Sequence, residues 1–430
     1  MTEERAAGTP SVAGERAVGG PMALLRGNRD FRRLLLASLV SQTGDWVVST
    51  GLAFHVYQLT GSTLSSAIML LVTRLPDVLF GSLAGVLADR WDRRRLLVAT
   101  DLLLAAGLLP LLVVRGPDQV WIVYAVALWS GVLGTLLAPA QKALLPGLVA
   151  GSRLVPANAL HAQSGQVARL LGAALGGVAV TAGGLPAIVL LDVTSFLISA
   201  ALQATLRAPA RSAAVTSVGG QWVSGLRLAG TDPGVRSLVV YMVITGLGEG
   251  IFATLAAPFV ADVLGGGADA YGVFVSAQAV GGLVGGLVVA VALGRAGPRA
   301  LLGWGTVVFG VLDLALFAYP LVAPALWPAL VLIALAGVPA AAATAGFATL
   351  AQTVTADDRR GGVIGLLGSA QAATSLGGMA LAGVLGGPVG IVAMLCLHGG
   401  GLVVAGLLVL ALGRSRSRTF PTVSGEADVG

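Results

Sequence analysis

Long apolar runs separated by short polar breaks dominate this sequence. The runs are about 20 residues long, the length that an α-helix needs to cross about 30 Å of hydrocarbon. Twelve such runs are present, so we predict twelve membrane-spanning helices. Their expected bounds are Leu34–Tyr57, Leu64–Ala88, Leu96–Val114, Val120–Leu137, Asn158–Thr181, Leu185–Leu206, Leu238–Val260, Ala270–Leu293, Leu301–Tyr319, Leu326–Thr349, Val363–Leu385 and Ile391–Leu412.

Composition supports a membrane protein. The 430 residues are 56% hydrophobic and only 11% charged, whereas soluble domains carry about 25% charged residues. The 62 glycines suit close helix packing in lipid. Cys396 is the only cysteine and lies in an apolar run, which excludes a disulfide framework and a Cys-based metal site. We expect no cofactor and no metal.

The basic residues set the expected orientation. With twelve spans, the connecting segments on one side hold almost every Arg and Lys, and those on the other side hold only Arg115. Cytoplasmic loops carry such an excess. We therefore predict a multi-pass protein of the cytoplasmic (inner) membrane with both termini in the cytoplasm. The net charge of +6 is explained by this topology, so we expect no nucleic-acid partner.

The two halves of the sequence repeat. A shift of about 205 positions lays Gln166 on Gln371, and a shift of about 204 lays Asp45 on Glu249. A long polar segment, with a possible surface helix at Gln221–Gly230, lies between the halves. We predict a disordered cytoplasmic tail (1–28), a first six-helix bundle (29–206), a cytoplasmic linker (207–236), a second six-helix bundle (237–413) and a cytoplasmic tail (414–430).

A charged segment from Gly85 to Arg95 separates the second and third spans, and we expect a tight cytoplasmic loop there. Its pattern Gly-x-x-x-Asp-Arg-x-x-Arg-Arg resembles the signature loop of the major facilitator superfamily, with Asp92 where that family usually has glycine. Gly44-Asp45-Trp46 and Leu191-Asp192-Val193-Thr194-Ser195-Phe196 are similar to segments of its drug-exporter branch, which includes macrolide efflux and enterobactin exporter proteins. The resemblance implies an all-α fold of two pseudo-symmetric six-helix bundles.

The resemblance also implies a function. We expect a secondary active transporter, a monomer, that exports a small amphipathic molecule of drug, macrolide or siderophore type by alternating access and proton antiport, with the substrate, protons and membrane lipids as partners. The fourth span lacks the arginine of many proton-coupled members, and Ala173 stands where the antiporter motif has proline. The sequence contains no nucleotide-binding or hydrolase motif, so we expect no enzyme. An importer or facilitator of a small metabolite, or a non-transporting receptor, would share this fold.

Charged side chains inside spans are costly in lipid and therefore mark candidate sites. Asp45 and Glu249 lie at matching depth in the first and seventh spans, which face each other in this fold, and we expect them to bind a proton or a cationic substrate. Asp45 would alternatively cap a helix break after Gly44.

Two arginines inside spans complete the cavity candidates. Arg74 would reach Asp77 or an acid of the first span, either functionally or as an internal ion pair. Arg169 would bind an anionic substrate group or hold a carboxylate. The remaining intramembrane acids and the histidines, which show no metal-like spacing, are expected to be structural: Asp101, Asp192, Asp313, His55, His161 and His398.

Two further sets concern movement. The resemblance implies that the signature segment braces the second and eleventh spans in one conformation and releases them in another, although its arginines would also serve as topology anchors. The expected gate residues are Gly85, Asp89, Arg90, Arg93 and Arg94. Glycines of the fifth and eleventh spans would allow close, sliding helix contacts or ordinary packing: Gly172, Gly176, Gly177, Gly377 and Gly378.

Overall fold

The computed structural model describes residues 21–90, 92–149, 154–207, 232–292, 296–354 and 360–414. Within these residues the chain is all helical, without a strand. The long helices are α2 (Arg29–Thr60), α3 (Thr63–Arg90), α4 (Arg93–Leu108), α5 (Val120–Leu148), α6 (Leu154–Ala204), α8 (Pro233–Pro258), α9 (Ala268–Ala292), α10 (Pro298–Ala318), α11 (Leu326–Val354), α12 (Arg360–Leu385) and α13 (Ile391–Arg414). A short helix α1 (Pro21–Gly27) precedes them. Short 3₁₀ or π segments occur at η1 (Leu109–Val113), η2 (Pro117–Gln119), η4 (Phe259–Val263) and η5 (Tyr319–Leu321).

The helices provide the twelve predicted crossings. Ten segments of the described chain are long and apolar enough to span a membrane. One of them, in α6, covers two crossings, because the chain reverses at Gly184, whose φ of 61° and ψ of −154° suit glycine. The twelfth crossing is α2, whose 32 residues extend about 48 Å. Polar residues such as Gln42 and Asp45 lower its hydropathy.

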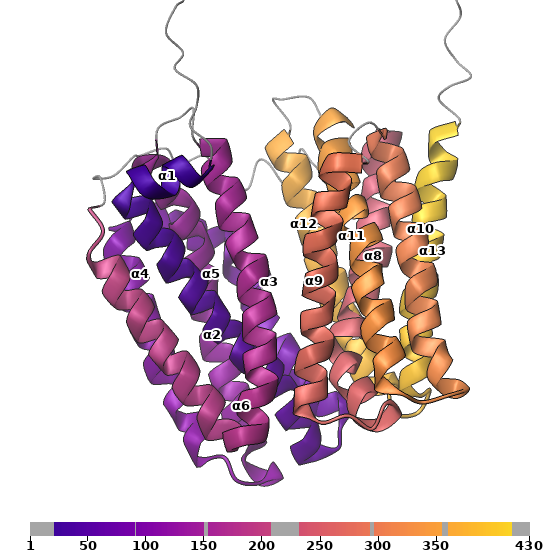
Figure 1. The fold of residues 1–430 in the computed structure, drawn as a ribbon, viewed down its shortest axis with the longest axis horizontal. Helices are drawn as coiled ribbons and strands as arrows, with labels where there is room; N and C mark the ends of the chain where they lie inside the picture. The colour runs from indigo at the N-terminus through magenta and orange to yellow at the C-terminus, as the bar shows by residue number, and fades with distance from the viewer. Residues whose placement is uncertain are drawn as a thin grey trace, which may run out of the picture.

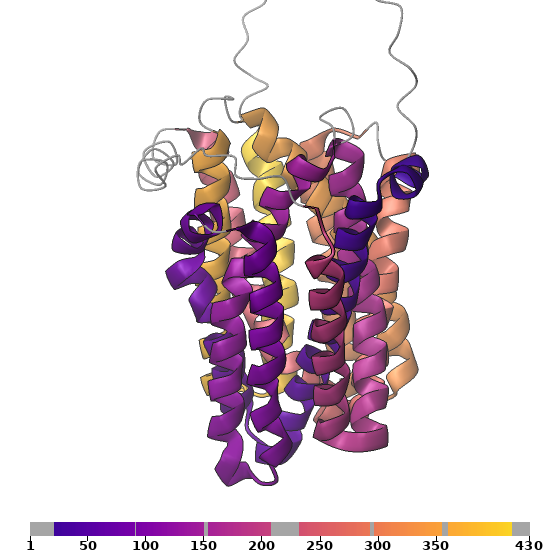
Figure 2. The ribbon, with the colours of Figure 1, turned by 90° about the vertical axis from the view of Figure 1, so that its left-hand side faces the viewer.

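The crossings form two bundles of six, as predicted. Figure 1 shows α2 to α6 on one side and α8 to α13 on the other, and Figure 2 shows the first bundle in front of the second. In each bundle the first helix packs against the last two crossings, α2 against both arms of α6 and α8 against α12 and α13. This equivalence is the pseudo-symmetry that the sequence repeat predicts.

The two ends of the molecule differ. One end, which we call the arginine-rich end, holds α1, the α3–α4 connection and the last turn of α13 (Figure 1). Arginines placed there by the described helices are Arg26, Arg29, Arg32, Arg33, Arg93, Arg94, Arg95, Arg207, Arg236 and Arg299. The other end, which we call the opposite end, holds Arg115.

Apolar packing joins the bundles at the opposite end. One core cluster there contains Phe54 of the first bundle together with Phe259 and Phe274 of the second. At the arginine-rich end each bundle has its own cluster, around Phe31 in the first and around Leu302 in the second. The described hydrophobic cores therefore bind the halves together at one end and leave them separate at the other.

The signature segment is more helical than expected. Instead of a tight loop from Gly85 onward, α3 continues through Arg90 and α4 begins at Arg93. No proline interrupts α3 from Gly85 to Arg90. Asp92 caps α4 by accepting a hydrogen bond from the Arg95 amide at 2.9 Å. The residue that departs from the family pattern therefore provides the N-cap.

The N-terminal segment also differs from the prediction of disorder over residues 1–28. Residues 21–27 form α1, and its Leu24 is buried in the same cluster as Phe31. Asn28 caps α2, and its side-chain amide donates to the Leu148 carbonyl at 2.6 Å. Apolar contacts and a cap thus order this stretch. The predicted surface helix at Gln221–Gly230 and the tail beyond Arg414 lie outside the described residues.

Candidate functional site between the two bundles

A polar cluster bridges the bundles at the first arm of α6, before the reversal at Gly184. The guanidinium of Arg169 donates a hydrogen bond to the side-chain oxygen of Gln278 on α9. It also lies over the ring of Trp46 on α2, 5.2 Å from the centroid, a distance at which a cation is attracted to an aromatic face. The hydroxyl of Ser276 donates to the Leu170 carbonyl at 3.1 Å. Arg169 therefore contacts both bundles. Its hydrogen-bond partner is the side-chain amide of Gln278 and not the carboxylate of an ion pair.

The buried Nε of Arg169 has no hydrogen-bond partner among the described residues. Its charge is within electrostatic range of Glu249, without forming an ion pair in the described chain. Because one guanidinium hydrogen bond is unused, the cluster retains capacity for an anionic or hydrogen-accepting group.

Glu249 projects from α8 between two buried glycines, Gly248 and Gly250. Its side chain is exposed and accepts a hydrogen bond from the side-chain amide of Gln371 on α12 at 3.0 Å. Because Gly248 and Gly250 have no side chains, the carboxylate of Glu249 stays accessible. Glu249 is thus an accessible carboxylate inside a span, which is what the predicted proton or cation site requires.

Asp45 occupies the equivalent position on α2. Its side chain is exposed and follows the buried Gly44. The groups within electrostatic range of it are the carboxyls of Asp101 and Asp192, both in the first bundle. Asp45 therefore lies within electrostatic range of acids of its own bundle, whereas Glu249 lies within electrostatic range of Arg169 in the other bundle.

Arg74 and Asp77 lie on the exposed side of α3. Their charges act on each other electrostatically, but neither forms an ion pair or hydrogen bond with another described residue. Pro76, which lies between them, is buried and packs against Gly131 of α5. The expected internal ion pair is not formed within the described chain, because both side chains point away from the helix interface.

The signature segment contacts its own bundle. The guanidinium of Arg94 donates to the Ala204 carbonyl, at the end of α6. Arg93 is half-buried in the first turn of α4. Gly85, Asp89 and Arg90 lie in the last turns of α3, and their side chains fall outside the described residues. The described contacts therefore tie the start of α4 to the end of α6.

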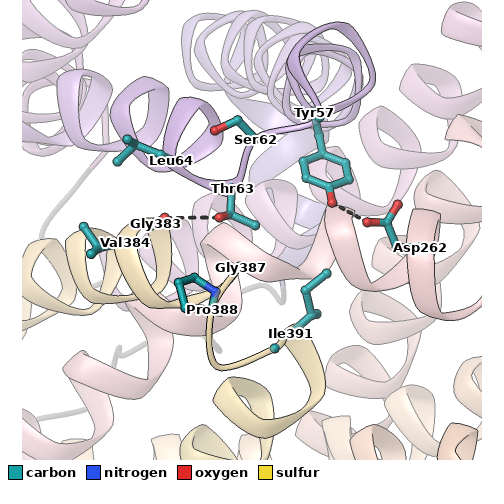
Figure 3. A pocket seen from close by; sticks show the side chains of 13 residues that line it. Tyr57, Ser62, Thr63, Leu64, Asp262, Gly383, Val384, Gly387, Pro388 and Ile391 are labelled. Carbon is teal, nitrogen blue, oxygen red and sulfur yellow. Dashed lines mark hydrogen bonds between the residues drawn. The ribbon is translucent and has the colours of Figure 1, made fainter.

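Within the described residues, the hydrogen bond between α3 and α12 lies at the opposite end instead. There the Thr63 hydroxyl donates to the Gly383 carbonyl at 3.1 Å, and the Tyr57 hydroxyl donates to the carboxylate of Asp262 (Figure 3). A recess of about 570 Å³ lies beside these bonds. Sequence reasoning missed Tyr57 and Asp262, because a tyrosine and an acid near span ends are common and nothing in their spacing pairs them.

The predicted packing glycines fall at three interfaces. Gly172 and Gly176 face the backbone of α2, Gly177 faces the backbone of α9 across the bundle interface, and Gly378 faces the backbone of α8. A Cβ at any of these four positions would lie 2.0 to 2.7 Å from a carbonyl oxygen. Gly377 makes only an ordinary contact, 3.9 Å from a Leu247 methyl, so its neighbours leave space for a side chain.

Comparison with known proteins agrees with this architecture. The family described as transmembrane secretion effector matches residues 20–420. The chain belongs to this family of the major facilitator superfamily. It is therefore a membrane transporter and not an enzyme. Its signature segment, two bundles and repeated halves are those of major facilitator transporters.

Several relatives of this transporter are efflux proteins. The multidrug efflux pump Tap of Mycolicibacterium fortuitum is 28% identical over 89% of this chain and 95% of its own length. Macrolide efflux protein A of Streptococcus pyogenes is 24% identical over 52% of this chain and 53% of its own. The matched segments cover 42% and 64% of two uncharacterised Bacillus subtilis MFS-type transporters.

Solved structures show the same fold. A bacterial homologue of the iron transporter ferroportin in an inward-facing state aligns with a TM-score of 0.75, 18% identity, and coverage of 89% of this chain and 98% of that one. The POT family transporter PepTSo aligns with a TM-score of 0.71 and 10% identity, over 91% of this chain and 99% of that one. At these identities the likeness concerns the fold.

Proposed function

We propose that this transporter is a secondary active exporter of small amphipathic organic molecules, driven by proton antiport across the cytoplasmic membrane. The efflux function of Tap and macrolide efflux protein A supports the direction and the substrate class. The exposed carboxylate of Glu249, within electrostatic range of Arg169 in the other bundle, supports the coupling. The positive-inside rule supports a cytoplasmic location of the arginine-rich end and of both termini.

The packing supports alternating access. The bundles share a core at the opposite end, closed further by the Tyr57–Asp262 and Thr63–Gly383 bonds, and have separate cores at the arginine-rich end. With the arginine-rich end in the cytoplasm, this conformation accepts substrate from inside. Export then requires the shared core to open and the arginine-rich ends to meet, with the signature segment bracing α3 and α12 at that stage.

The main support for proton antiport is the placement of Glu249 on α8 and Arg169 on α6. The two residues belong to different bundles but lie within electrostatic range of each other. When Glu249 is ionised, its attraction to Arg169 favours approach of the two bundles at this depth. A proton on Glu249 removes that attraction, and a cationic substrate competes with Arg169 for the same carboxylate. Proton and substrate therefore exclude each other at one group, which is the requirement of an antiporter.

Energetically one proton is sufficient for useful export. Moving one charge through 100 mV releases about 2.3 kcal/mol, which corresponds to a gradient of about 50-fold at about 1.4 kcal/mol per factor of ten. Asp45 would be the second proton-binding carboxyl, in the other bundle. We expect a monomer to suffice, because the cavity candidates all come from one chain.

The test is transport in proteoliposomes containing the full chain, with ethidium as the amphipathic cation and a pH-sensitive dye recording proton movement. We expect ethidium flux against its gradient when a proton gradient is imposed, and collapse of that flux by a protonophore. Glu249→Gln should abolish the coupled flux. Asp118→Asn, an exposed loop carboxyl changed in the same way, is the matched control.

Outcomes separate the alternatives. Ethidium flux that equilibrates but is unchanged by the proton gradient would indicate a facilitator. Flux in the direction of the proton gradient would indicate an importer. If Glu249→Gln and Asp118→Asn retained equal coupled flux, the proposed role of Glu249 would be wrong.

A further inference from the structure

A polar stripe runs along the second arm of α6, inside the first bundle. Its members are spaced three or four residues apart and so share one helix face: Asp192, Ser195, Ser199 and Gln203. All four are buried, with 0 to 7% of their surface exposed. Buried polar groups in a spanning helix are costly unless they are paired or functional, so the stripe needs an explanation that apolar packing does not provide.

Two hydrogen bonds lie within the stripe, and a third connects it to α4. The Ser195 hydroxyl donates to the Asp192 carboxylate at 2.9 Å. The Gln203 amide donates to Ser199 at 2.8 Å and to Oδ2 of Asp101 at 3.0 Å. Asp101 lies on α4 and is 0% exposed. The helices α2 and α4 both pack against α6 (Figures 1 and 2). Asp192 therefore lies against Gly44 of α2, and Gln203 bonds Asp101 of α4. We call these buried side chains the polar core.

This core has two oxygen atoms without a donor. Oδ1 of Asp101 and Oε1 of Gln203 are buried and have no partner among the described residues. Both atoms only accept hydrogen bonds if Asp101 is ionised. A buried acceptor without a donor is destabilising. A proton on the Asp101 carboxyl supplies the missing donor and removes an uncompensated charge.

No cation neutralises the acids within the described chain. The basic side chains at this end of α6 are those of Arg94 and Arg33, which donate to the carbonyls of Ala204 and Thr205 instead. On α5 the polar group facing α2 is the amide of Gln141, at 3.4 Å from the Ser38 hydroxyl. The three acids do not form a group that could hold a metal ion. Among the possible partners for these carboxyls, a proton fits the described side chains.

The core is continuous with the exposed carboxyl of Asp45. A Cβ at Gly44 would lie 2.1 Å from Oδ1 of Asp192, so the glycine forms a notch that admits the Asp192 carboxyl to the surface of α2. Asp45 is the next residue and is exposed. The carboxyls of Asp45, Asp192 and Asp101 lie within electrostatic range of one another.

We propose that Asp101 and Asp192 form a proton-binding site inside the first bundle, which exchanges its proton with the cavity through Asp45. The proposal deepens the proposed antiport by naming where the first bundle stores its proton. Only a proton moves, from one carboxyl oxygen to another, and Ser195, Ser199 and Gln203 position the two acids. Arg33 and Arg94 at this end of α6 bond the backbone of Thr205 and Ala204, and Arg33 also pairs with the Asp30 carboxylate at 3.4 Å.

Infrared spectroscopy of the purified full-length protein tests the site without a substrate. A protonated carboxyl has a carbonyl stretching band that its ionised form lacks. We expect the wild-type protein to show this band at neutral pH and to lose it when the pH is raised. Asp101→Asn and Asp192→Asn should each remove part of the band, whereas Asp118→Asn should leave it unchanged.

Absence of a protonated-carboxyl band from the wild-type protein at neutral pH would overturn the proposal, and this result needs no variant to fold. Retention of the full band by both Asn variants, each checked by thermal melting, would also overturn it. In proteoliposomes the two variants should flatten the pH profile of ethidium flux. Protonophore-insensitive flux in the wild type would remove the antiport and leave the infrared test to decide the site by itself.

Discussion

A backbone-to-backbone contact between the bundles offers the sharpest test of alternating access. At the opposite end α6 and α9 cross with almost no side chain between them: a Cβ on Gly272 would lie 2.6 Å from the Ala173 carbonyl oxygen and 2.9 Å from the Gly177 Cα. Ordinary contact begins at 3.4 Å. Because the atoms met are backbone, no rotamer change relieves the overlap. Gly272→Ala should therefore push the bundles apart at this end.

The expected magnitude follows from the overlap. Overpacking of a close contact costs about 1–3 kcal/mol, which changes a two-state equilibrium about 5- to 150-fold. The cost falls only on the conformation in which the opposite end is closed. Gly286→Ala is the matched control, because a Cβ there meets nothing within 4 Å. Both substitutions change helix propensity by the same amount, so their difference reports the contact.

Distance measurement between spin labels is the assay. Cys396, the only native cysteine, is replaced by alanine, and labels are attached at Gln58→Cys and Val389→Cys, exposed positions of different bundles at the opposite end. In Gly272→Ala the population of long distances should rise and that of short distances should fall, whereas Gly286→Ala should match the parent. Identical distance distributions in both variants would refute the inference that this contact closes the opposite end.

Three other substitutions have defined outcomes. Tyr57→Phe removes the bond to Asp262 and should raise the long-distance population of the same label pair about 2- to 10-fold, since a hydrogen bond contributes about 0.5–1.5 kcal/mol; an unchanged ratio would contradict this. Asp92→Ala should lower the melting temperature, because an N-cap contributes about 0.5–2 kcal/mol, while ethidium flux per folded molecule stays the same. His398→Leu should lower the free energy of unfolding by about 1–3 kcal/mol, because it leaves the buried Asp313 without its 3.0 Å hydrogen-bond partner. Denaturant unfolding of His398→Leu should then show partial recovery on adding Asp313→Leu, and no recovery would argue against the pair.

The His398–Asp313 pair illustrates the limit of sequence reasoning about single residues. His398 lacks neighbours with metal-like spacing, so the sequence suggests an isolated histidine. In the structure it bonds Asp313 from a different helix and fills the space beside Gly248, where a Cβ would lie 2.5 Å from its Nδ1. Asp192 fills the corresponding space beside Gly44. The repeat in the sequence aligns the glycines, but the groups that they admit are seen only after folding.

Local signals near the signature segment were partly misleading. Six charged residues in a short stretch favour an exposed connection, which predicts a loop. Arginine is a good helix former, so the helix α3 continues through Arg90 and the connection to α4 is short. Exposure and helical structure are compatible wherever a spanning helix extends beyond the hydrocarbon.

The sequence by itself determined the spans, the repeated halves, the family and the gathering of arginines at one end. It did so because hydrocarbon accepts only apolar helices whose backbone bonds are internal, and that requirement is visible in any window of 20 residues. Only the tertiary structure decided which polar groups meet. Arg169 and Gln278 are 109 residues apart, and Tyr57 and Asp262 are 205 apart. Their contact depends on the rotation of each helix and on the angle between the bundles, which hydropathy does not encode.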